Sequence, residues 1–273
     1  MSAIGLSFLT NGRRPALIGM IHVGALPGTP CSSQTVTTIA AQAVAEAKLL
    51  ADGGADAVIL ENMHDVPYLN RGVGPEIVSA MTAVCTAVRA AVTLPLGVQV
   101  LAGANREAIA VAHAAACQFV RCEGFVFAHV ADEGLMPQAD AGPLLRYRRA
   151  IGAQSVAIAA DIKKKHASHA ITADVDLADS ARTAEFFGAD AVVVTGSATG
   201  QPTAPADLAA AAGAVAIPVF VGSGVTPQNV PSLADADALV VGSFIKREGR
   251  WANPPDPARL ARLRAAIDAL PDR

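Results

Sequence analysis

Short apolar runs alternate along the chain with longer amphipathic stretches. Eight such runs, each ending in a small or polar residue, are typical of buried parallel strands: Ala16–Ile21, Ala57–Leu60, Gly97–Leu101, Phe119–Cys122, Val156–Ala160, Ala191–Thr195, Val219–Val221 and Leu239–Val241. Helix-like stretches lie between them: Thr35–Asp52, Pro75–Ala91, Asn105–Ala115, Ala141–Ile151, Asp176–Phe187, Ala206–Gly213, a short one beginning near Pro227, and Pro257–Ala269. This alternation predicts βαβ units and a parallel sheet.

Eight units in 273 residues match a (β/α)8 barrel, the TIM barrel. A doubly wound sheet is the alternative, but the units are evenly spaced to the end and leave no remainder for a second domain. Gly-Ala-Asp also recurs at 54–56 and 188–190, where it is typical of a helix-to-strand turn. We therefore expect one α/β domain over residues 1–273. Its seventh helix looks abbreviated, which is common in barrels of the phosphate-binding type.

Composition places much of the chain in a core. Hydrophobic residues make up 52% and charged residues 16%, below the roughly 25% usual for soluble domains. The net charge of −3 gives no electrostatic reason to expect a nucleic acid or an anionic membrane as partner. We expect a homo-oligomer to account for part of the low charge content.

The chain shows no segment that predicts a membrane span or a secretory signal. The uncharged stretches 15–45 and 208–234 are each interrupted by prolines and glycines or by polar clusters, whereas a spanning helix needs about 20 apolar residues in a row. The apolar run 3–9 has no basic residue before it. Cys31, Cys85, Cys117 and Cys122 form no C-x-x-C pair, which predicts reduced thiols. Together these features favour a cytoplasmic protein.

Polar residues follow several of the predicted strands at their carboxyl ends, where barrel enzymes carry their chemistry. His22 ends the first run, and Glu61, Asn62, His64 and Asp65 follow the second. Period-two alternation puts Arg121 and Glu123 on one side of the fourth strand. On the fifth strand Asp161 points with Ala159, and Lys163 and Lys165 continue that side if the chain stays extended.

The segment Asp161-Ile-Lys-Lys-Lys-His166 is the densest titratable cluster. A carboxylate beside lysines suits acid–base chemistry, and a desolvated lysine can act as base or Schiff-base nucleophile. A solvated basic loop capped by one Asp is the plain alternative, as hydrogen-bonded structural roles are for His22 and His64. His166 and Arg121 complete the catalytic candidates with Glu61. A metal such as Mg²⁺ stays open, because no spacing motif demands one; its candidate ligands are His22, Glu61, Asp65 and Asp161.

Glycine-rich segments follow the last three strands. They are Thr195-Gly-Ser-Ala-Thr-Gly200, Val221-Gly-Ser-Gly-Val-Thr226 and Val241-Gly-Ser-Phe244. Glycine lets the backbone approach an anion, and adjacent N–H groups complement its charge. We predict a phosphate site from Gly196, Ser197, Gly222, Ser223, Gly224, Gly242 and Ser243. Tight turns alone would explain any single Gly-Ser pair.

Six ordered motifs occur along the chain: Ile18-Gly-Met-Ile-His-Val-Gly-Ala-Leu-Pro-Gly-Thr-Pro30, Glu61-Asn-Met-His-Asp-Val-Pro67, Leu145-Arg-Tyr-Arg-Arg149, Ala160-Asp-Ile-Lys-Lys-Lys-His166, Val194-Thr-Gly-Ser-Ala-Thr-Gly200 and Val221-Gly-Ser-Gly-Val-Thr-Pro227. Together these motifs resemble the BtpA family. The resemblance implies a phosphate-binding barrel, and it implies as shared polar residues His22, Glu61, Asn62, Asp65, Arg121, Asp161, Lys165 and His166. Three positions depart from the family pattern: His64 where Gly is common, Glu123 where Asn is common and Lys163 where His is common. These changes imply that substrate choice can differ here.

The leading hypothesis is an enzyme that acts on a small phosphorylated metabolite, a sugar phosphate or nucleotide, as an isomerase, epimerase or lyase. Asp161 and Glu61 would be its acid–base groups, and Lys163 or Lys165 would stabilise an enolate-like charge or attack a carbonyl. Two alternatives stay open. One is a non-catalytic assembly factor, because the family takes its name from photosystem I accumulation. The other is a nucleoside-type hydrolase or phosphorylase.

Overall fold

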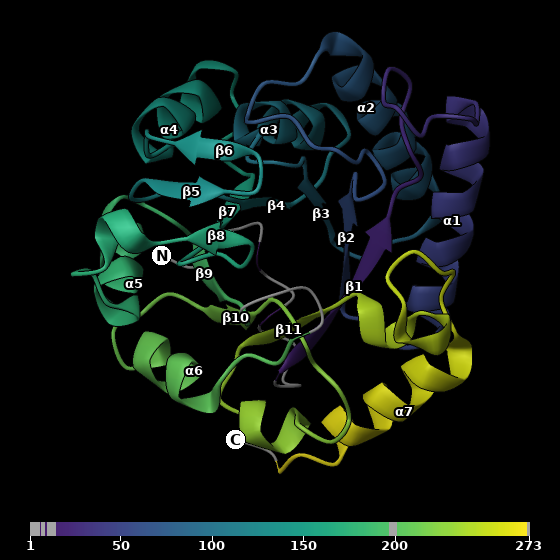
Figure 1. Ribbon diagram of the computed structural model, residues 1–273. Helices are drawn as coiled ribbons and strands as arrows, with labels where there is room; N and C mark the ends of the chain where they lie inside the picture. Colours follow the sequence, from purple (N-terminus) through teal and green to yellow (C-terminus); the bar gives the residue numbers. More distant parts are fainter. Residues whose placement is uncertain (1–5, 7–8, 10–14, 197–200, 272–273) are drawn as a thin grey trace.

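The computed structural model describes residues 6, 9, 15–196 and 201–271. Eight parallel strands form a closed barrel in which β11 pairs again with β1 (Figure 1). Around the barrel they are β1 (Ala16–His22), β2 (Ala57–Glu61), β3 (Leu96–Gln99), β4 (Phe119–Cys122), β7 (Ala157–Asp161), β9 (Ala191–Val194), β10 (Val219–Val221) and β11 (Ala238–Val241). The barrel predicted from the sequence is confirmed, and each strand lies within two residues of its predicted bounds.

Helices surround the barrel on the outside (Figure 1). They are α1 (Val36–Asp52), α2 (Pro75–Ala91), α3 (Asn105–Ala114), α4 (Ala141–Ala150), α5 (Leu177–Phe186), α6 (Pro205–Ala212) and α7 (Pro257–Asp268). Local signals fix their ends. Thr35 caps α1 by accepting a hydrogen bond from the Thr38 amide, and Asp256 caps α7 by accepting from the Ala258 and Arg259 amides.

The short seventh helix predicted near Pro227 is present as a 3₁₀ helix and begins three residues later, at Val230. After β10 the chain forms only the 3₁₀ helix η3 (Val230–Leu233). The Asn229 side chain accepts from the Thr226 amide at 2.8 Å and donates to the Gly224 carbonyl at 2.8 Å. These bonds close a side-chain turn at the place where an α-helix would have had to begin. Two further 3₁₀ helices, η4 (Ser243–Ile245) and η5 (Arg247–Gly249), follow β11.

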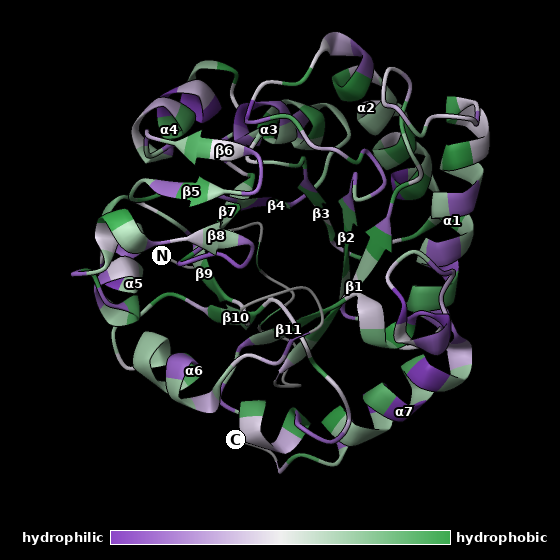
Figure 2. Ribbon diagram, viewed as in Figure 1, coloured by the Kyte–Doolittle hydropathy of each residue, from purple (hydrophilic) through white to green (hydrophobic). Residues whose placement is uncertain are grey.

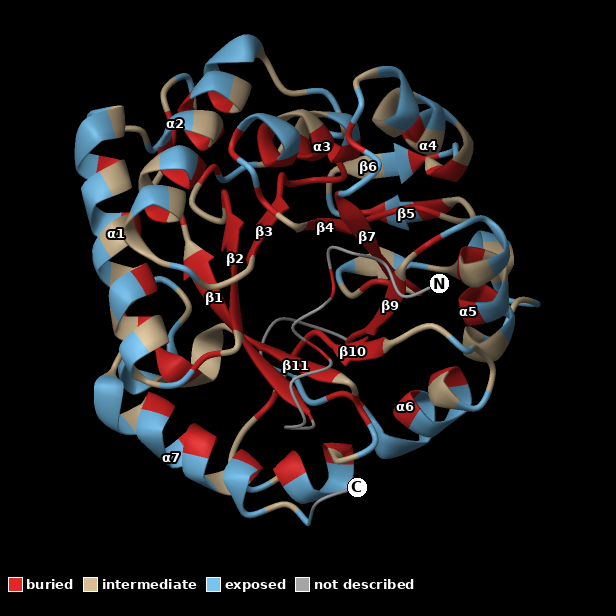
Figure 3. Ribbon diagram, turned by 180° about the vertical axis from the view of Figure 1, so that it is seen from behind, coloured by how far each residue is buried: buried red, intermediate tan, exposed pale blue. Residues whose placement is uncertain are grey.

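Two layers of core lie on the two sides of the barrel wall. The strands are hydrophobic and buried along most of their length, while the helices expose their outer faces (Figures 2 and 3). One cluster fills the space between strands and helices, and the other fills the barrel interior around Phe119 and Phe220. Leu6 and Leu9 belong to the interior cluster. A filled interior leaves the strand ends as the place for a ligand.

A small antiparallel sheet, which the sequence did not predict, lies in the connections after β4 and β7. It consists of β5 (His129–Ala131), β6 (Gly134–Met136) and β8 (Ala167–Ser168), with the 3₁₀ helix η2 (Ala170–Thr172) following it in the chain. Strands of two or three residues are too short to show a period. This sheet brings the turn between β5 and β6 to the mouth of the barrel. None of the helices in the described part of the chain is both long and apolar enough to cross a membrane.

Candidate functional site

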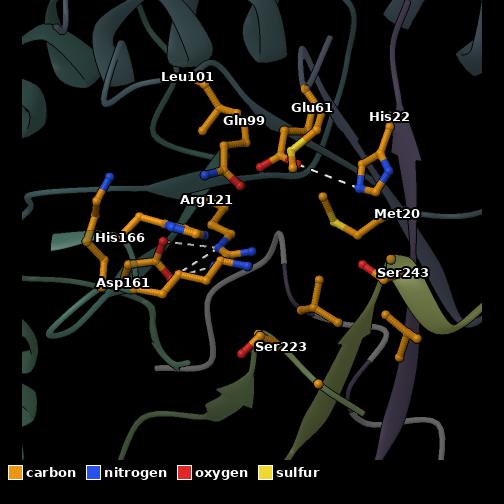
Figure 4. A pocket seen from close by; sticks show the side chains of 18 of the residues that line it. Met20, His22, Glu61, Gln99, Leu101, Arg121, Asp161, His166, Ser223 and Ser243 are labelled. Carbon is orange, nitrogen blue, oxygen red and sulfur yellow. Dashed lines mark hydrogen bonds and ion pairs between the residues drawn. The ribbon is translucent and has the colours of Figure 1, made fainter. Parts of the chain in front are cut away.

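A cavity of about 420 Å³ opens at the carboxyl ends of the strands. Figure 4 shows side chains from opposite walls of the barrel pointing into it. The sequence-predicted residues that line it are His22, Glu61, Arg121, Glu123, Asp161, Lys165, His166, Gly222, Ser223, Gly224, Gly242 and Ser243. The structure therefore brings together most of the predicted polar residues.

Arg121 and Asp161 form a buried ion pair at the ends of β4 and β7. The Arg121 Nε atom donates to both carboxylate oxygens of Asp161 at 3.1 and 3.2 Å, and Nη2 lies 3.0 Å from Oδ1. The side chains are 6% and 1% exposed, so this pair is almost completely removed from water. Burial acts to lower the pKa of Arg121, but Asp161 and Glu61 outweigh it, and the pKa is raised. The guanidinium thus stays charged and presents a fixed cation to the cavity.

Glu61 and His22 face each other across the ends of β2 and β1. Glu61 Oε2 lies 3.8 Å from His22 Nε2. Burial raises the pKa of Glu61 to about 7, against the opposing effects of Arg121 and Lys165. Burial, followed by the charge of Lys246, lowers the pKa of His22 to about 3. A carboxyl group that titrates near neutrality therefore lies beside an imidazole that remains neutral.

The tautomer of His22 follows from its second contact. Nδ1 lies 2.8 Å from the carbonyl oxygen of Trp251, which can only accept a hydrogen bond. The proton of the neutral ring is therefore on Nδ1, and Nε2 directs its lone pair toward Glu61. This arrangement orients a proton acceptor next to a group able to carry a proton, as acid–base catalysis requires.

The structure separates the three lysines that follow β7. The strand ends at Asp161, and Lys163 turns the chain with φ +43°, so the alternation expected through Lys165 does not continue. Lys163 Nζ donates to the Thr172 carbonyl at 3.4 Å and does not line the main cavity. The expectation that Lys163 contacts substrate is therefore not supported by its position. Lys164 lines the cavity instead of Lys163, and its Nζ lies 3.1 Å from Glu123 Oε1.

Lys165 lines the cavity on the same side as the Arg121–Asp161 pair. Burial lowers its pKa, and the positive charge of Arg121 lowers it further. His166 follows at the rim, where its side chain is 40% exposed and its Nδ1 lies 3.6 Å from Asp132 Oδ2. Of the predicted lysines, Lys165 is the one that the fold places as a cation or nucleophile within reach of a bound molecule.

Asn62 and Asp65 form a buried clamp that stays outside the cavity. Asp65 accepts from the Leu26 amide and from Asn62 Nδ2, each at 2.8 Å. Asn62 Oδ1 in turn accepts from the Leu101 amide at 2.7 Å. The clamp ties together the chain segments that follow β1, β2 and β3. The rim role expected for both residues is thus replaced by a role in holding loops.

The metal ligands that the sequence offered do not assemble. Asp65 uses both oxygens in the clamp, and Asp161 is bound by Arg121. His22 and Glu61 remain as a pair. Among the residues that the structure describes, no group of three or more His, Cys, Asp or Glu side chains could hold a metal ion.

The glycine-rich segments form one wall of the cavity, which we call the glycine cradle: Gly222, Ser223, Gly224, Gly242 and Ser243. Gly224 has φ +67°, and a Cβ there would lie 2.2 Å from the Gln201 carbonyl oxygen. A Cβ at Gly242 would lie 3.0 Å from His22 Nε2. Gly224 therefore requires glycine, whereas a Cβ at Gly242 would press on the His22 ring; both positions bring backbone close to the cavity.

Ser223 lines the cavity, but its hydroxyl group is already hydrogen-bonded within the protein. The Ser223 hydroxyl accepts from the Gly196 amide at 2.7 Å and donates to the Gln201 carbonyl at 3.1 Å. It thus joins two loops, and its proton is already committed. Ser197 lies outside the described residues, and Gly196 is not among the residues that line the cavity.

Sequence reasoning missed several residues of the cavity wall, of which Arg259 matters most. It lies in the first turn of α7, where its Nε donates to the Phe244 carbonyl at 2.5 Å and its guanidinium lies 4.5 Å from the centre of the Phe244 ring. Nothing in the local sequence marks it, because it comes 18 residues after β11 ends. Other missed residues are Met20, Met63, Tyr68, Gln99, Leu101, Asp132, Glu133, Lys164, Thr226 and Phe244. Gln99 was within reach of the strand-end argument, because it is the last residue of β3.

A second hollow of about 840 Å³ lies between α1 and the segment after η4, on the other side of His22. Its buried cation, Lys246, contacts Glu46 Oε2 at 2.6 Å and so is already paired. The smaller cavity carries the group with pKa near neutrality, the fixed guanidinium and the glycine cradle. We therefore take the smaller cavity as the functional site.

Comparison with known proteins gives related sequences over nearly the whole chain. The model of the BtpA family matches residues 13–269. An uncharacterized mitochondrial protein of Caenorhabditis elegans is 42% identical over 273 residues, which is 97% of each chain. The photosystem I biogenesis protein BtpA of Synechocystis is 34% identical over 265 residues, which is 96% of this chain and 90% of the relative.

Solved structures of low sequence identity share the fold. Tryptophan synthase of Mycobacterium tuberculosis has a TM-score of 0.61 at 18% identity, with 97% of this chain and 98% of that chain covered. Phosphoribosyl anthranilate isomerase of Thermus thermophilus has a TM-score of 0.57 at 13% identity, with 94% and 100% covered. At this identity the likeness shows the barrel fold alone.

Proposed function

The chain belongs to the BtpA family, and from that premise we propose that it is an enzyme that binds a small phosphorylated metabolite at the barrel mouth and moves a proton on it. The observation that carries the proposal is Glu61, a buried carboxyl group with a pKa of about 7, whose Oε2 lies 3.8 Å from Nε2 of a neutral His22. Such a group can both take and return a proton at physiological pH.

The glycine cradle supports a phosphate group as the anchor of this ligand. It lies after β10 and β11, the seventh and eighth strands of the barrel, where barrels commonly bind phosphate. Arg259 lines the same wall and offers a guanidinium, which suits a phosphate. Structural relatives whose names include a phosphorylated group, such as the phosphoribosyl anthranilate isomerase, agree with this proposal.

Positive charge beside the acid–base pair suits a reaction that develops negative charge on oxygen. Arg121 is fixed by Asp161, and Lys165 lines the same cavity. These cations would stabilise an enolate-like oxygen while Glu61 moves the proton. We therefore propose an isomerase, epimerase or lyase. Asp161, which is bound to Arg121, then acts mainly by orienting that guanidinium.

An assembly role is the second candidate, and a surface feature favours it. Phe186 and Phe187, at the end of α5, are 85% and 48% exposed. Exposed aromatic pairs are typical of protein contacts, and the Synechocystis relative is named for photosystem I biogenesis. A homo-oligomer would use the same surface, so light scattering of the Phe186→Ser variant separates self-association from a foreign partner.

The cytoplasmic location expected from the sequence stays a prediction. The Caenorhabditis elegans relative, which is 42% identical to this chain, is named as a mitochondrial protein.

A thermal-shift screen against phosphorylated sugars, nucleotides and inorganic phosphate, with and without Mg²⁺, tests the proposal. Ligand at about 100 times its dissociation constant adds roughly 2.7 kcal/mol, which is a resolvable shift. We expect inorganic phosphate and one phosphorylated class to stabilise the protein. Turnover of that class should fall by at least about 100-fold in Glu61→Gln and stay unchanged in Glu248→Gln, an exposed control. The absence of any phosphate-dependent shift would refute the proposal.

A further inference from the structure

On the wall opposite the glycine cradle, three side chains each carry a buried oxygen that lacks a hydrogen-bond donor in the described part of the chain. We call Gln99, Glu123 and Glu133 the acceptor wall. Resting on the proposed function, we propose that it binds the hydroxyl groups of the substrate, and that the substrate is a monosaccharide phosphate with at least two free hydroxyls at the end remote from the phosphate. The unpaired oxygens at one end of the cavity and the glycine cradle at the other end support this assignment.

Three buried oxygens of the acceptor wall have no hydrogen-bond partner in the described part of the chain: Gln99 Oε1, Glu123 Oε2 and Glu133 Oε2. Buried polar atoms without partners are rare in folded proteins, because each loses its bonds to water and gains nothing. All three of these residues line the main cavity. A ligand that supplies hydrogen-bond donors at this wall would give each of these oxygens its missing partner.

The positions of these residues give the ligand its direction. Gln99 ends β3 and Glu123 follows β4, whereas the cradle follows β10 and β11 on the opposite side of the closed barrel. Glu133 joins them from the turn between β5 and β6. Figure 4 shows Gln99 and Ser243 on different sides of the cavity, with Arg121 beside Gln99. A molecule that spans the cavity therefore meets the cradle, then the acid–base groups, then the acceptor wall.

Neutral hydroxyl groups suit the acceptor wall better than an ammonium group does. Lys164 Nζ already lies 3.1 Å from Glu123 Oε1, and Arg121 and Lys165 line the same cavity. These three cations offset the carboxylates of Glu123, Glu133 and Asp161, which line the same cavity, so a further cation gains little attraction there. A hydroxyl group donates a hydrogen bond without adding charge. The Tyr68 hydroxyl cannot serve the wall from within, because it donates to the Met63 carbonyl at 2.8 Å.

The size of the cavity favours a monosaccharide over a nucleotide. Its volume of about 420 Å³ lies near the lower end of the roughly 300–1,000 Å³ typical of ligand sites. Met63 and Leu101 add apolar surface to it, which limits the space beyond the acceptor wall. A base attached to the sugar would have to extend past the rim.

The test compares ligands that differ by one group. Binding of inorganic phosphate, ribose 5-phosphate, 2-deoxyribose 5-phosphate, glucose 6-phosphate and glucosamine 6-phosphate is measured by calorimetry on the native protein and on Gln99→Met. We expect at least one sugar phosphate to bind more tightly than phosphate. Removing its hydroxyl should weaken binding by about tenfold or more, since one hydrogen bond is lost.

The variant isolates the wall from the cradle. Gln99→Met keeps the length of the side chain and removes its acceptor, so the preference for the hydroxylated sugar should fall to about threefold or less while inorganic phosphate still binds. Glu133→Met, at the rim, removes both carboxylate acceptors and serves as the second variant if Gln99→Met does not fold. Equal binding of the hydroxylated and deoxy sugars to the native protein would overturn the inference, as would tighter binding of the amino sugar. Failure of inorganic phosphate and of every sugar phosphate to bind would instead refute the proposed function.

Discussion

Replacing Glu61 with Gln should remove a pH-dependent loss of stability from the protein. Burial raises the pKa of Glu61 from 4.5 to about 7. Below pH 4.5 this carboxyl group is protonated in both the folded and the unfolded chain. Between pH 4.5 and 7 the unfolded chain releases the proton while the folded chain keeps it, so the free energy of unfolding falls as the pH rises. Above pH 7 both states are ionised, and the loss is complete.

The size of this loss follows from the two pKa values. Each tenfold change in proton affinity is worth about 1.4 kcal/mol, so the change from 4.5 to about 7 amounts to about 3 kcal/mol. The amide introduced by Glu61→Gln cannot ionise and avoids this cost. We therefore expect Glu61→Gln to gain about 3 kcal/mol relative to the native protein between pH 4.5 and pH 8.

Urea denaturation at pH 4.5, 6, 7 and 8 measures this difference directly. The exposed Glu248 provides the matched control, because Glu248→Gln removes the same charge without a buried site. The double comparison cancels the effects of pH that all three proteins share. If the stabilities of the native protein and of Glu61→Gln change in parallel with pH, then Glu61 is not a buried proton carrier, and the acid–base assignment loses its basis.

Three further predictions test other parts of the structure. Arg121→Met leaves the buried carboxylate of Asp161 without its cation and should lower the free energy of unfolding, measured in urea, by about 3–5 kcal/mol. The double variant Arg121→Met/Asp161→Leu should lose less stability than Arg121→Met alone. Losses that simply add up would show that the two residues do not stabilise each other. Gly242→Ala should weaken calorimetric binding of inorganic phosphate by about tenfold or more, since its Cβ would crowd the cavity; Gly72→Ala, which meets nothing within 4 Å, should bind as the native protein does. A thiol reagent should label only the exposed Cys31 quickly, so Cys31→Ser should abolish the fast phase, and a fast phase that persists would show that a buried thiol is accessible.

The barrel could be predicted because buried parallel strands appear in the sequence as continuous apolar runs. Those runs also located Glu61 and Asp161, since both stand at a strand end. Period-two reasoning failed beyond the last strand residue. Lys163 takes a positive φ at once, so the alternation ends there: Lys163 turns away from the cavity, while both Lys164 and Lys165 line it.

The sequence could not predict the cavity residues that come from segments distant from the strand ends. Arg259 enters the cavity from α7, and Glu133 enters from a sheet whose strands have two or three residues. Their positions depend on how loops pack on one another, which no periodicity records. Asn62 and Asp65 were correctly marked as polar residues at a strand end, but a composition of amide and carboxylate does not distinguish a loop clamp from a ligand site.

The clamp of Asn62 and Asp65 has a consequence for how the protein can change over evolutionary time. It fixes the chain after β1, β2 and β3 through backbone amides such as those of Leu26 and Leu101, whatever side chains those loops carry. The small sheet after β4 and β7 takes no part in it. The clamp therefore keeps the loops after the first three strands in place while other residues at the mouth change. The small sheet is held by separate bonds, because Asn70 Nδ2, in the segment after β2, donates to the carbonyls of Glu133 and Leu135 at 3.3 and 3.0 Å. A change in the backbone of that sheet would therefore also disturb the segment after β2.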